Sequence, residues 1–134
     1  HELKKLSPEI EIHQQATPLL VPLIENDGMA WSEDILSHYL KPLLDKDIEC
    51  LLLGCTHYPF LKEQIRKVAG RDIPLLSQDE IIPAKLADYL KRHPEYKISR
   101  NGKTEFIVSD LTDNYRKSAE GLYGSTLNIV KMAA

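Results

Sequence analysis

The side chains with the most obvious chemistry lie together in the run Gly54-Cys55-Thr56-His57. The thiol of Cys55 can lose its proton and act as a base, and the imidazole of His57 can relay that proton or donate a hydrogen bond. The hydroxyl and backbone N–H of Thr56 can hold a carboxylate. Gly54 lets the chain turn sharply and lets a ligand approach the backbone. This combination predicts an activated thiol beside a small polar binding loop.

The position of the run between two regular elements supports this interpretation. It follows residues 48–53, an almost wholly apolar stretch that predicts a strand covered on both faces by helices. Pro59 suits the first turn of a following helix. We therefore expect Cys55 at the carboxyl end of a strand, where open parallel α/β sheets bind ligands. We also expect it at a helix N-terminus, whose dipole favours the thiolate.

A structural role for Cys55 is the alternative, because a lone cysteine often serves as a small buried apolar residue. The residues by themselves leave both interpretations open. Cys50 differs, since it lies inside the predicted strand and about 16 Å from Cys55 if the chain is extended. We therefore expect Cys50 in the core, and we expect no Cys-Cys-His zinc site and no bound metal.

Strand-like and helix-like segments alternate along the chain, which predicts an α/β fold with a mainly parallel sheet and flanking helices. Alternating apolar and polar residues predict a strand at 9–14, and apolar runs predict strands at 48–53, 73–76 and 105–109. Helical spacing predicts helices at 18–26, 32–44, 59–69, 79–92 and 113–123. Ser32 and Asp113 are the expected N-caps, and Gly70 and Gly124 the expected helix ends.

Composition narrows the classes of function. The 134 residues are 43% hydrophobic and 28% charged, which is the balance of a soluble globular protein. The net charge of −3 disfavours nucleic acid and anionic membranes as partners, and no apolar stretch approaches the roughly 20 residues that span a bilayer. Two cysteines without a secretory signal predict a reduced, cytoplasmic setting. The missing initial Met indicates a piece of a longer protein.

Three segments resemble one known family. The run LLLGCTHYPFLKEQI at 51–65 resembles the second cysteine motif of the glutamate racemases, in the aspartate/glutamate racemase family. Residues 16–25 resemble the family's A-C-P-x-x-V-P-L-x-E segment, with Thr17 where many members have Cys. Residues 106–124 resemble its terminal F-x-x-[ST]-G-D segment, although Asp110 follows Ser109 without the usual Gly. The resemblance implies a Rossmann-like half of a two-domain racemase.

The resemblance also implies a reaction and roles. Family members racemise an amino acid without a cofactor, using two cysteines on opposite faces of the substrate. By match to the motif, Cys55 is one of the pair, while Thr56 and His57 contact the substrate or assist Cys55. Glu25 matches the acidic residue that the family places near this Cys and His, where it would orient the imidazole. The alternative for Glu25 is a solvated carboxylate at a helix end.

Only half of such an enzyme is present, since the family's N-terminal D-S-G-x-G-G, P-Y-G and C-N-T stretches are absent from this sequence. On the family's template, residues 1–78 belong to the second domain and residues 79–134 complete the first. The implied partners are L- and D-glutamate, the missing N-terminal half and, at full length, a second copy. The implied role is D-glutamate supply for peptidoglycan, with this piece alone inactive. An aspartate or other amino-acid racemase, or a non-catalytic α/β binding module, remains an alternative.

Overall fold

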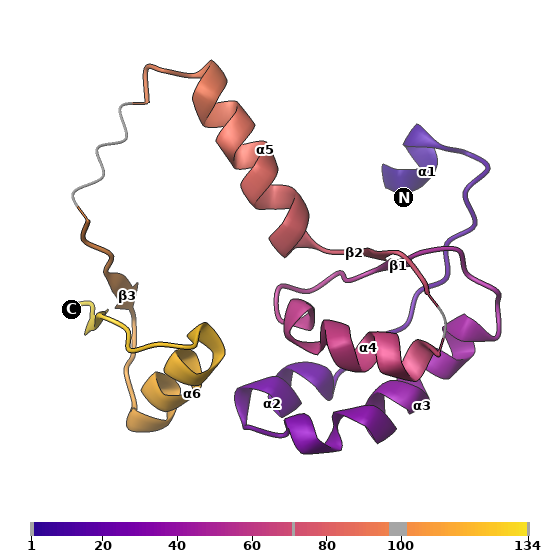
Figure 1. The fold of residues 1–134 in the computed structure, drawn as a ribbon, viewed down its shortest axis with the longest axis horizontal. Helices are drawn as coiled ribbons and strands as arrows, with labels where there is room; N and C mark the ends of the chain where they lie inside the picture. Colours follow the sequence, from indigo (N-terminus) through magenta and orange to yellow (C-terminus); the bar gives the residue numbers. More distant parts are fainter. Residues whose placement is uncertain (1, 71, 97–101, 134) are drawn as a thin grey trace.

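The chain forms short parallel strands joined by helices, as the computed structural model in Figure 1 shows for residues 2–70, 72–96 and 102–133. The α-helices are α1 (Glu2–Leu6), α2 (Leu20–Glu25), α3 (Ser32–Leu44), α4 (Lys62–Ala69), α5 (Gln78–Arg92) and α6 (Asp113–Tyr123). Two 3-10 helices are η1 (Met29–Trp31) and η2 (Tyr58–Leu61). The strands are β1 (Leu51–Leu52), β2 (Leu75–Leu76), β3 (Phe106–Val108) and β4 (Ile129–Lys131). β1 pairs with β2 and β3 with β4, both in parallel, which confirms the predicted α/β class.

The main core lies where α2, α3 and α4 meet the end of β1 (Figure 1). The apolar positions of α3 recur at helical spacing, so that one face of this helix is buried while the other meets solvent. Leu36 and Leu61 are almost completely buried and anchor α3 and the start of α4. The full buried set is Leu20, Ile24, Leu36, Tyr39, Leu40, Leu53, Leu61 and Ile65.

One face of the β1–β2 pair is open, which corrects the prediction of a strand covered on both faces. In the parallel register, Leu51 lies opposite Leu75 and Leu52 opposite Leu76. Leu51 and Leu75 pack against the core, whereas Leu52 and Leu76 are 59% and 44% exposed. Successive side chains of a strand point to opposite faces, and the described helices cover only one of them.

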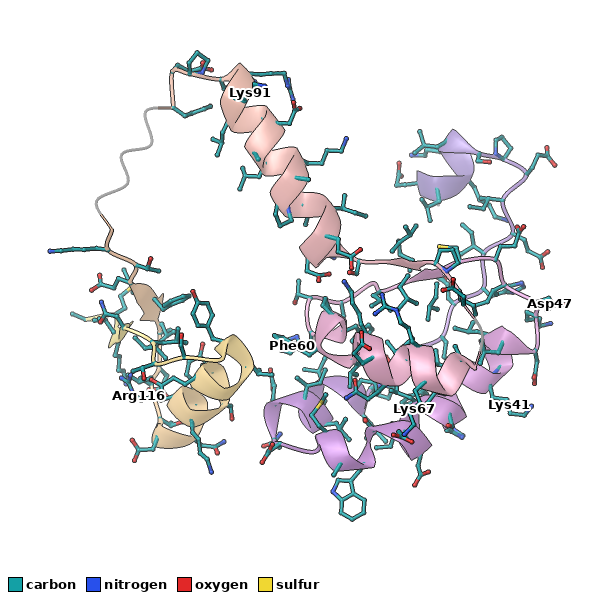
Figure 2. All side chains as sticks on the ribbon, viewed as in Figure 1. Lys41, Asp47, Phe60, Lys67, Lys91 and Arg116 are labelled. Carbon is teal, nitrogen blue, oxygen red and sulfur yellow. The ribbon has the colours of Figure 1, made fainter. Side chains whose placement is uncertain are left out.

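The predicted strand at 9–14 does not form, and the described residues offer it no strand to pair with. An alternating pattern is insufficient, because extended backbone needs a neighbour to satisfy its N–H and C=O groups. By contrast, β4 was not predicted from the sequence. Its short run Ile129–Lys131 pairs with β3, and Arg116 of α6 donates hydrogen bonds to the carbonyls of Leu127 and Ile129 at 3.4 and 3.2 Å (Figure 2).

The predicted helix ends at Gly70 and Gly124 are confirmed, whereas the predicted N-caps are wrong. Gly70 and Gly124 end α4 and α6 with positive φ angles of 64° and 81°. Ser32 is not an N-cap, because η1 leads directly into α3 and the Ser32 hydroxyl donates to the carbonyl of Met29 at 2.7 Å. The cap of α6 is Thr112 rather than Asp113, since the Thr112 hydroxyl oxygen accepts from the N–H of Tyr115 at 3.1 Å.

The helix α5 projects from the rest of the chain and buries none of its residues (Figure 1). Its apolar side chains stay exposed, including Ile81, Ile82, Leu86 and Tyr89. In the part of the chain that the structure describes, no helix is long and apolar enough to cross a membrane. The exposure of these side chains leaves the apolar side of α5 uncovered in the described structure.

Candidate functional site

Cys55 lies in the turn that follows β1, at the carboxyl end of the strand as predicted. The carbonyl of Cys55 accepts from the N–H of Tyr58 at 3.2 Å, which closes the turn and leads into η2. A methyl group added at Gly54 would meet no atom within 4 Å, so the backbone before Cys55 is open to an approaching molecule. Thr56 is exposed in the same turn.

The prediction that Cys55 lies at the N-terminus of an α-helix is wrong. The chain first forms η2 from Tyr58, and α4 begins only at Lys62. A helix dipole acts within about the first turn, so α4 contributes little at Cys55. Two side chains near this thiol are better placed than α4 to act on it.

Those side chains are His57 and Glu25. The sulfur of Cys55 is 3.8 Å from Nδ1 of His57, and Nε2 of His57 is 3.0 Å from Oε1 of Glu25. An ionised carboxylate only accepts hydrogen bonds, so Nε2 must carry the proton in this contact. In the neutral imidazole, Nδ1 is then bare and faces the thiol as an acceptor. The three groups therefore form a row that can draw a proton from Cys55 onto His57.

The structure thus brings Cys55, His57 and Glu25 together. Glu25 is the last residue of α2, and Leu20 and Ile24 hold this helix in the core. The turn after it is tight, because Asp27 has a positive φ of 58° and a Cβ at Gly28 would lie 3.0 Å from the Leu23 carbonyl oxygen. Glu25 is consequently held near the turn that carries His57.

Sequence reasoning missed the pair formed by Thr17 and Tyr58. Their hydroxyl oxygens form a hydrogen bond across 41 positions of sequence. Both residues lie inside the segments that resemble the family, which could have drawn attention to them. Neither Thr nor Tyr, however, predicts such a contact by its residue type. A second missed contact joins Ser118 of α6 to α2, where its hydroxyl donates to the carbonyl of Glu25 at 3.0 Å.

Lys62 is the first residue of α4, and sequence reasoning did not identify its role. Its side chain is only 11% exposed and binds the first turn of α5, with Nζ 2.8 Å from Asp79 and in contact with Glu80. The hydrogen bond from Lys62, together with one from Ser77, holds the pKa of Asp79 below its usual range. The hydrogen bonds that Lys62 donates to Asp79 and Glu80 raise the pKa of Lys62. Lys62 therefore ties α5 to α4.

Cys50 is exposed rather than in the core, because β1 begins only at Leu51 and Cys50 lies just before it. Both cysteines are free thiols. Across residues 2–70, 72–96 and 102–133, no group of three or more His, Cys, Asp or Glu side chains is arranged to hold a metal ion.

Comparison with known proteins points to one family. The chain is 36% identical over 132 residues to a glutamate racemase of Thermoanaerobacter sp. strain X514, covering 96% of this chain and 49% of that protein. It is 33% identical to a glutamate racemase of Neisseria meningitidis serogroup B, covering 96% and 48%. No protein-family model matches the chain.

Solved structures give the same result. The glutamate racemase of Francisella tularensis in complex with D-glutamate superimposes with a TM-score of 0.87 at 27% identity, over 99% of this chain and 51% of that one. Glutamate racemase isoform RacE1 from Bacillus anthracis gives 0.85 at 28% identity, over 98% and 50%.

The fold therefore resembles that of amino-acid racemases, over about half of their length. In sequence and structure the chain is a glutamate racemase homologue, and it spans about half the length of the curated relatives it matches.

Alkylation tests whether the row of three side chains activates Cys55. Accessibility alone favours Cys50, which is exposed, over Cys55, which is partly buried. We predict the opposite order with iodoacetamide at pH 7, because His57 can take the Cys55 proton. Mass spectrometry of the time course gives both rates in one sample. Slower or equal labelling of Cys55 would favour a structural role for this thiol.

The ion pairs of Lys62 with Asp79 and Glu80 should stabilise the fold only within a certain range of pH. The lowered pKa of Asp79 means that its contribution to stability is present above about pH 3.9 and is lost as pH falls through the lowered value. The raised pKa of Lys62 means that its contribution is present below about pH 10.4 and is lost at higher pH. The Tm of the unchanged chain should exceed that of Lys62→Met between these limits and converge with it outside them. A difference in Tm that stays constant at every pH would contradict a stabilising role for these ion pairs.

Proposed function

We propose that this chain supplies one face of a glutamate racemase active site, which interconverts L- and D-glutamate without a cofactor. The observation that carries the proposal is the row Cys55–His57–Glu25 at the carboxyl end of β1, in a chain that glutamate racemases match over 96% of its length. Thr56, exposed beside Cys55, is proposed to bind the substrate carboxylate through its hydroxyl and N–H. His57 is proposed both to assist Cys55 and to contact the substrate.

Inversion by this route needs an acid–base group on each face of the substrate, and both groups are proposed to be thiols. Cys55 passes its proton to Nδ1 of His57, and the thiolate removes the α-proton from one face of glutamate. A second thiol then gives its proton to the opposite face of the carbanion, which inverts the centre. A single base would return the proton to the face it came from. In the reverse direction, the roles of the two thiols exchange.

Glu25 serves this cycle by fixing the imidazole. With Nε2–H bound to the carboxylate, His57 presents Nδ1 to the sulfur, and the imidazolium that forms after proton transfer is stabilised by the Glu25 charge. The Glu25 side chain is 53% exposed, so solvent screens this charge, and its main contribution is orientation.

The second thiol is proposed to come from the N-terminal half of the enzyme. On this proposal, residues 1–78 are part of the second domain and residues 79–134 complete the first. Two-stranded sheets are marginal by themselves, and both sheets of the described chain have only two strands. The exposed apolar residues of β1, β2 and α5 give the missing half a surface to cover, among them Leu52, Leu76, Ile81 and Ile82.

Glutamate is the favoured substrate, because the matched relatives are named as glutamate racemases and the Francisella tularensis structure holds D-glutamate. The proposal extends to a cytoplasmic enzyme that supplies D-glutamate for peptidoglycan and forms a homodimer at full length.

Fusion to a complementary half tests the proposal. The 134-residue chain alone should not racemise glutamate. Joined behind the N-terminal half of the Thermoanaerobacter relative, it should do so, as followed by circular dichroism of L-glutamate solutions. Cys55→Ser in the fusion should lower kcat by at least about 10²-fold, the scale of general acid–base catalysis, whereas Cys50→Ser should leave it unchanged.

Activity of the unfused chain, or of the Cys55→Ser fusion, would overturn the two-thiol account. A folded fusion that racemises aspartate in preference to glutamate would overturn the substrate assignment.

A further inference from the structure

Each end of α2 is held by one of two consecutive residues, which are His57 at the end of the turn and Tyr58 at the start of η2. At the C-terminal end of α2, Glu25 binds His57. Just before its N-terminal end, Thr17 binds Tyr58. We propose that the Thr17–Tyr58 pair is a positioning contact that sets the geometry of Glu25, His57 and Cys55. The inference rests on the proposed function of that row.

A helix this short needs such a contact. The six residues of α2 span about 9 Å, at about 1.5 Å per residue, and only Leu20 and Ile24 of the helix are fully buried. Apolar contacts are not directional, so they permit a short helix to slide or rotate by a fraction of a turn. The Glu25 carboxylate lies at the far end, where such a movement displaces it most. A directional hydrogen bond at the other end removes this freedom.

Thr17 is well placed for this role, because its hydroxyl is not used to cap α2. Leu19 occupies the cap position and makes no side-chain hydrogen bond. The carbonyl of Thr17 accepts from the N–H of Leu20 at 3.2 Å, so Thr17 is joined to the first turn of α2 through the backbone. A restraint on the Thr17 hydroxyl is therefore transmitted directly to the helix.

Tyr58 is equally fixed on its own side. Its N–H donates to the carbonyl of Cys55 at 3.2 Å, and its ring packs against the buried core. The hydroxyl at the end of this ring consequently has a defined position relative to the turn. His57 and Tyr58 are adjacent in sequence. The Glu25–His57 and Thr17–Tyr58 contacts therefore fix the position of α2 relative to one short stretch of backbone.

Ser118 holds the same helix from another direction, but only at its C-terminal end, through the carbonyl of Glu25. It does not restrain the end near Thr17. Both hydroxyl groups of the Thr17–Tyr58 pair are uncharged, so the pair acts on Cys55 through geometry rather than through an electric field.

The test uses the ratio of the Cys55 to the Cys50 alkylation rate in the 134-residue chain, with Cys50 as an internal reference. Thr17→Val and Tyr58→Phe each remove one hydroxyl with little change in shape. Each should lower the ratio by about two- to tenfold, the scale of one lost hydrogen bond. Thr17→Ser keeps the hydroxyl and should retain the ratio. An unchanged ratio in folded Thr17→Val and Tyr58→Phe, or an equal fall in Thr17→Ser, would overturn the proposal.

A double-variant cycle separates positioning from general destabilisation. If Thr17 acts through Glu25, Thr17→Val should have no further effect in a Glu25→Ala background. An additive fall would contradict this route. The ¹⁵N shifts of the His57 ring give a second readout, since Thr17→Val should reduce the population of the Nε2–H tautomer. An unaltered tautomer population would also contradict it.

If the variants do not fold, the unchanged chain still decides the question. Nuclear Overhauser contacts between the Tyr58 ring and the Thr17 methyl group should be present, and their absence would overturn the proposal. The proposed function fails separately, through an inactive fusion, because the alkylation ratio requires no racemase activity.

Discussion

The site depends on how α2 packs beside the turn that follows β1. Parallel pairing with β2 fixes where β1 ends, and Leu53 continues from that end into the core. The turn then presents Cys55 and His57 on the side toward α2. Because Leu20 and Ile24 bury one side of this helix, Glu25 reaches the imidazole. Without that packing, Glu25 would not be held beside His57.

The uncovered surfaces follow from the same architecture. The described helices cover one side of the β1–β2 pair, which leaves Leu52 and Leu76 exposed. The helix α5 extends beyond them, held at its base by Lys62, and buries no residue of its own. Apolar surface of this extent has a physical cost unless another part of a protein covers it. A chain that matches half of each relative is consistent with that requirement.

Local patterns in the sequence predicted much of the fold. The apolar spacing of α3, the strand ending at the turn and the glycines after α4 and α6 are short-range features, so they could be recognised without a structure. The turn itself was located correctly, because an apolar run followed by Gly54 and small polar residues is a local signal.

Features that depend on long-range contacts were missed or predicted wrongly. The segment 9–14 has a strand pattern, but strand formation depends on a partner that the pattern does not reveal. Lys62 has the polarity of a surface residue, and only the position of α5 shows that it is nearly buried. Cys50 lies one residue before β1 and is exposed, and the prediction of a strand covered on both faces did not reveal that one face is open. The Thr17–Tyr58 pair joins residues too far apart in sequence for spacing to show.

The central claim is that Cys55 is one of two acid–base groups on opposite faces of the substrate. The most direct test of this claim is to follow the hydrogen at Cα. L-Glutamate is incubated in D₂O with the fusion described above, and the isotope at Cα is followed by NMR and mass spectrometry during early turnover. The account predicts that the D-glutamate formed carries deuterium at Cα, while the remaining L-glutamate still carries protium. D-Glutamate that retains protium would show a single base returning the same hydrogen, and would contradict the account.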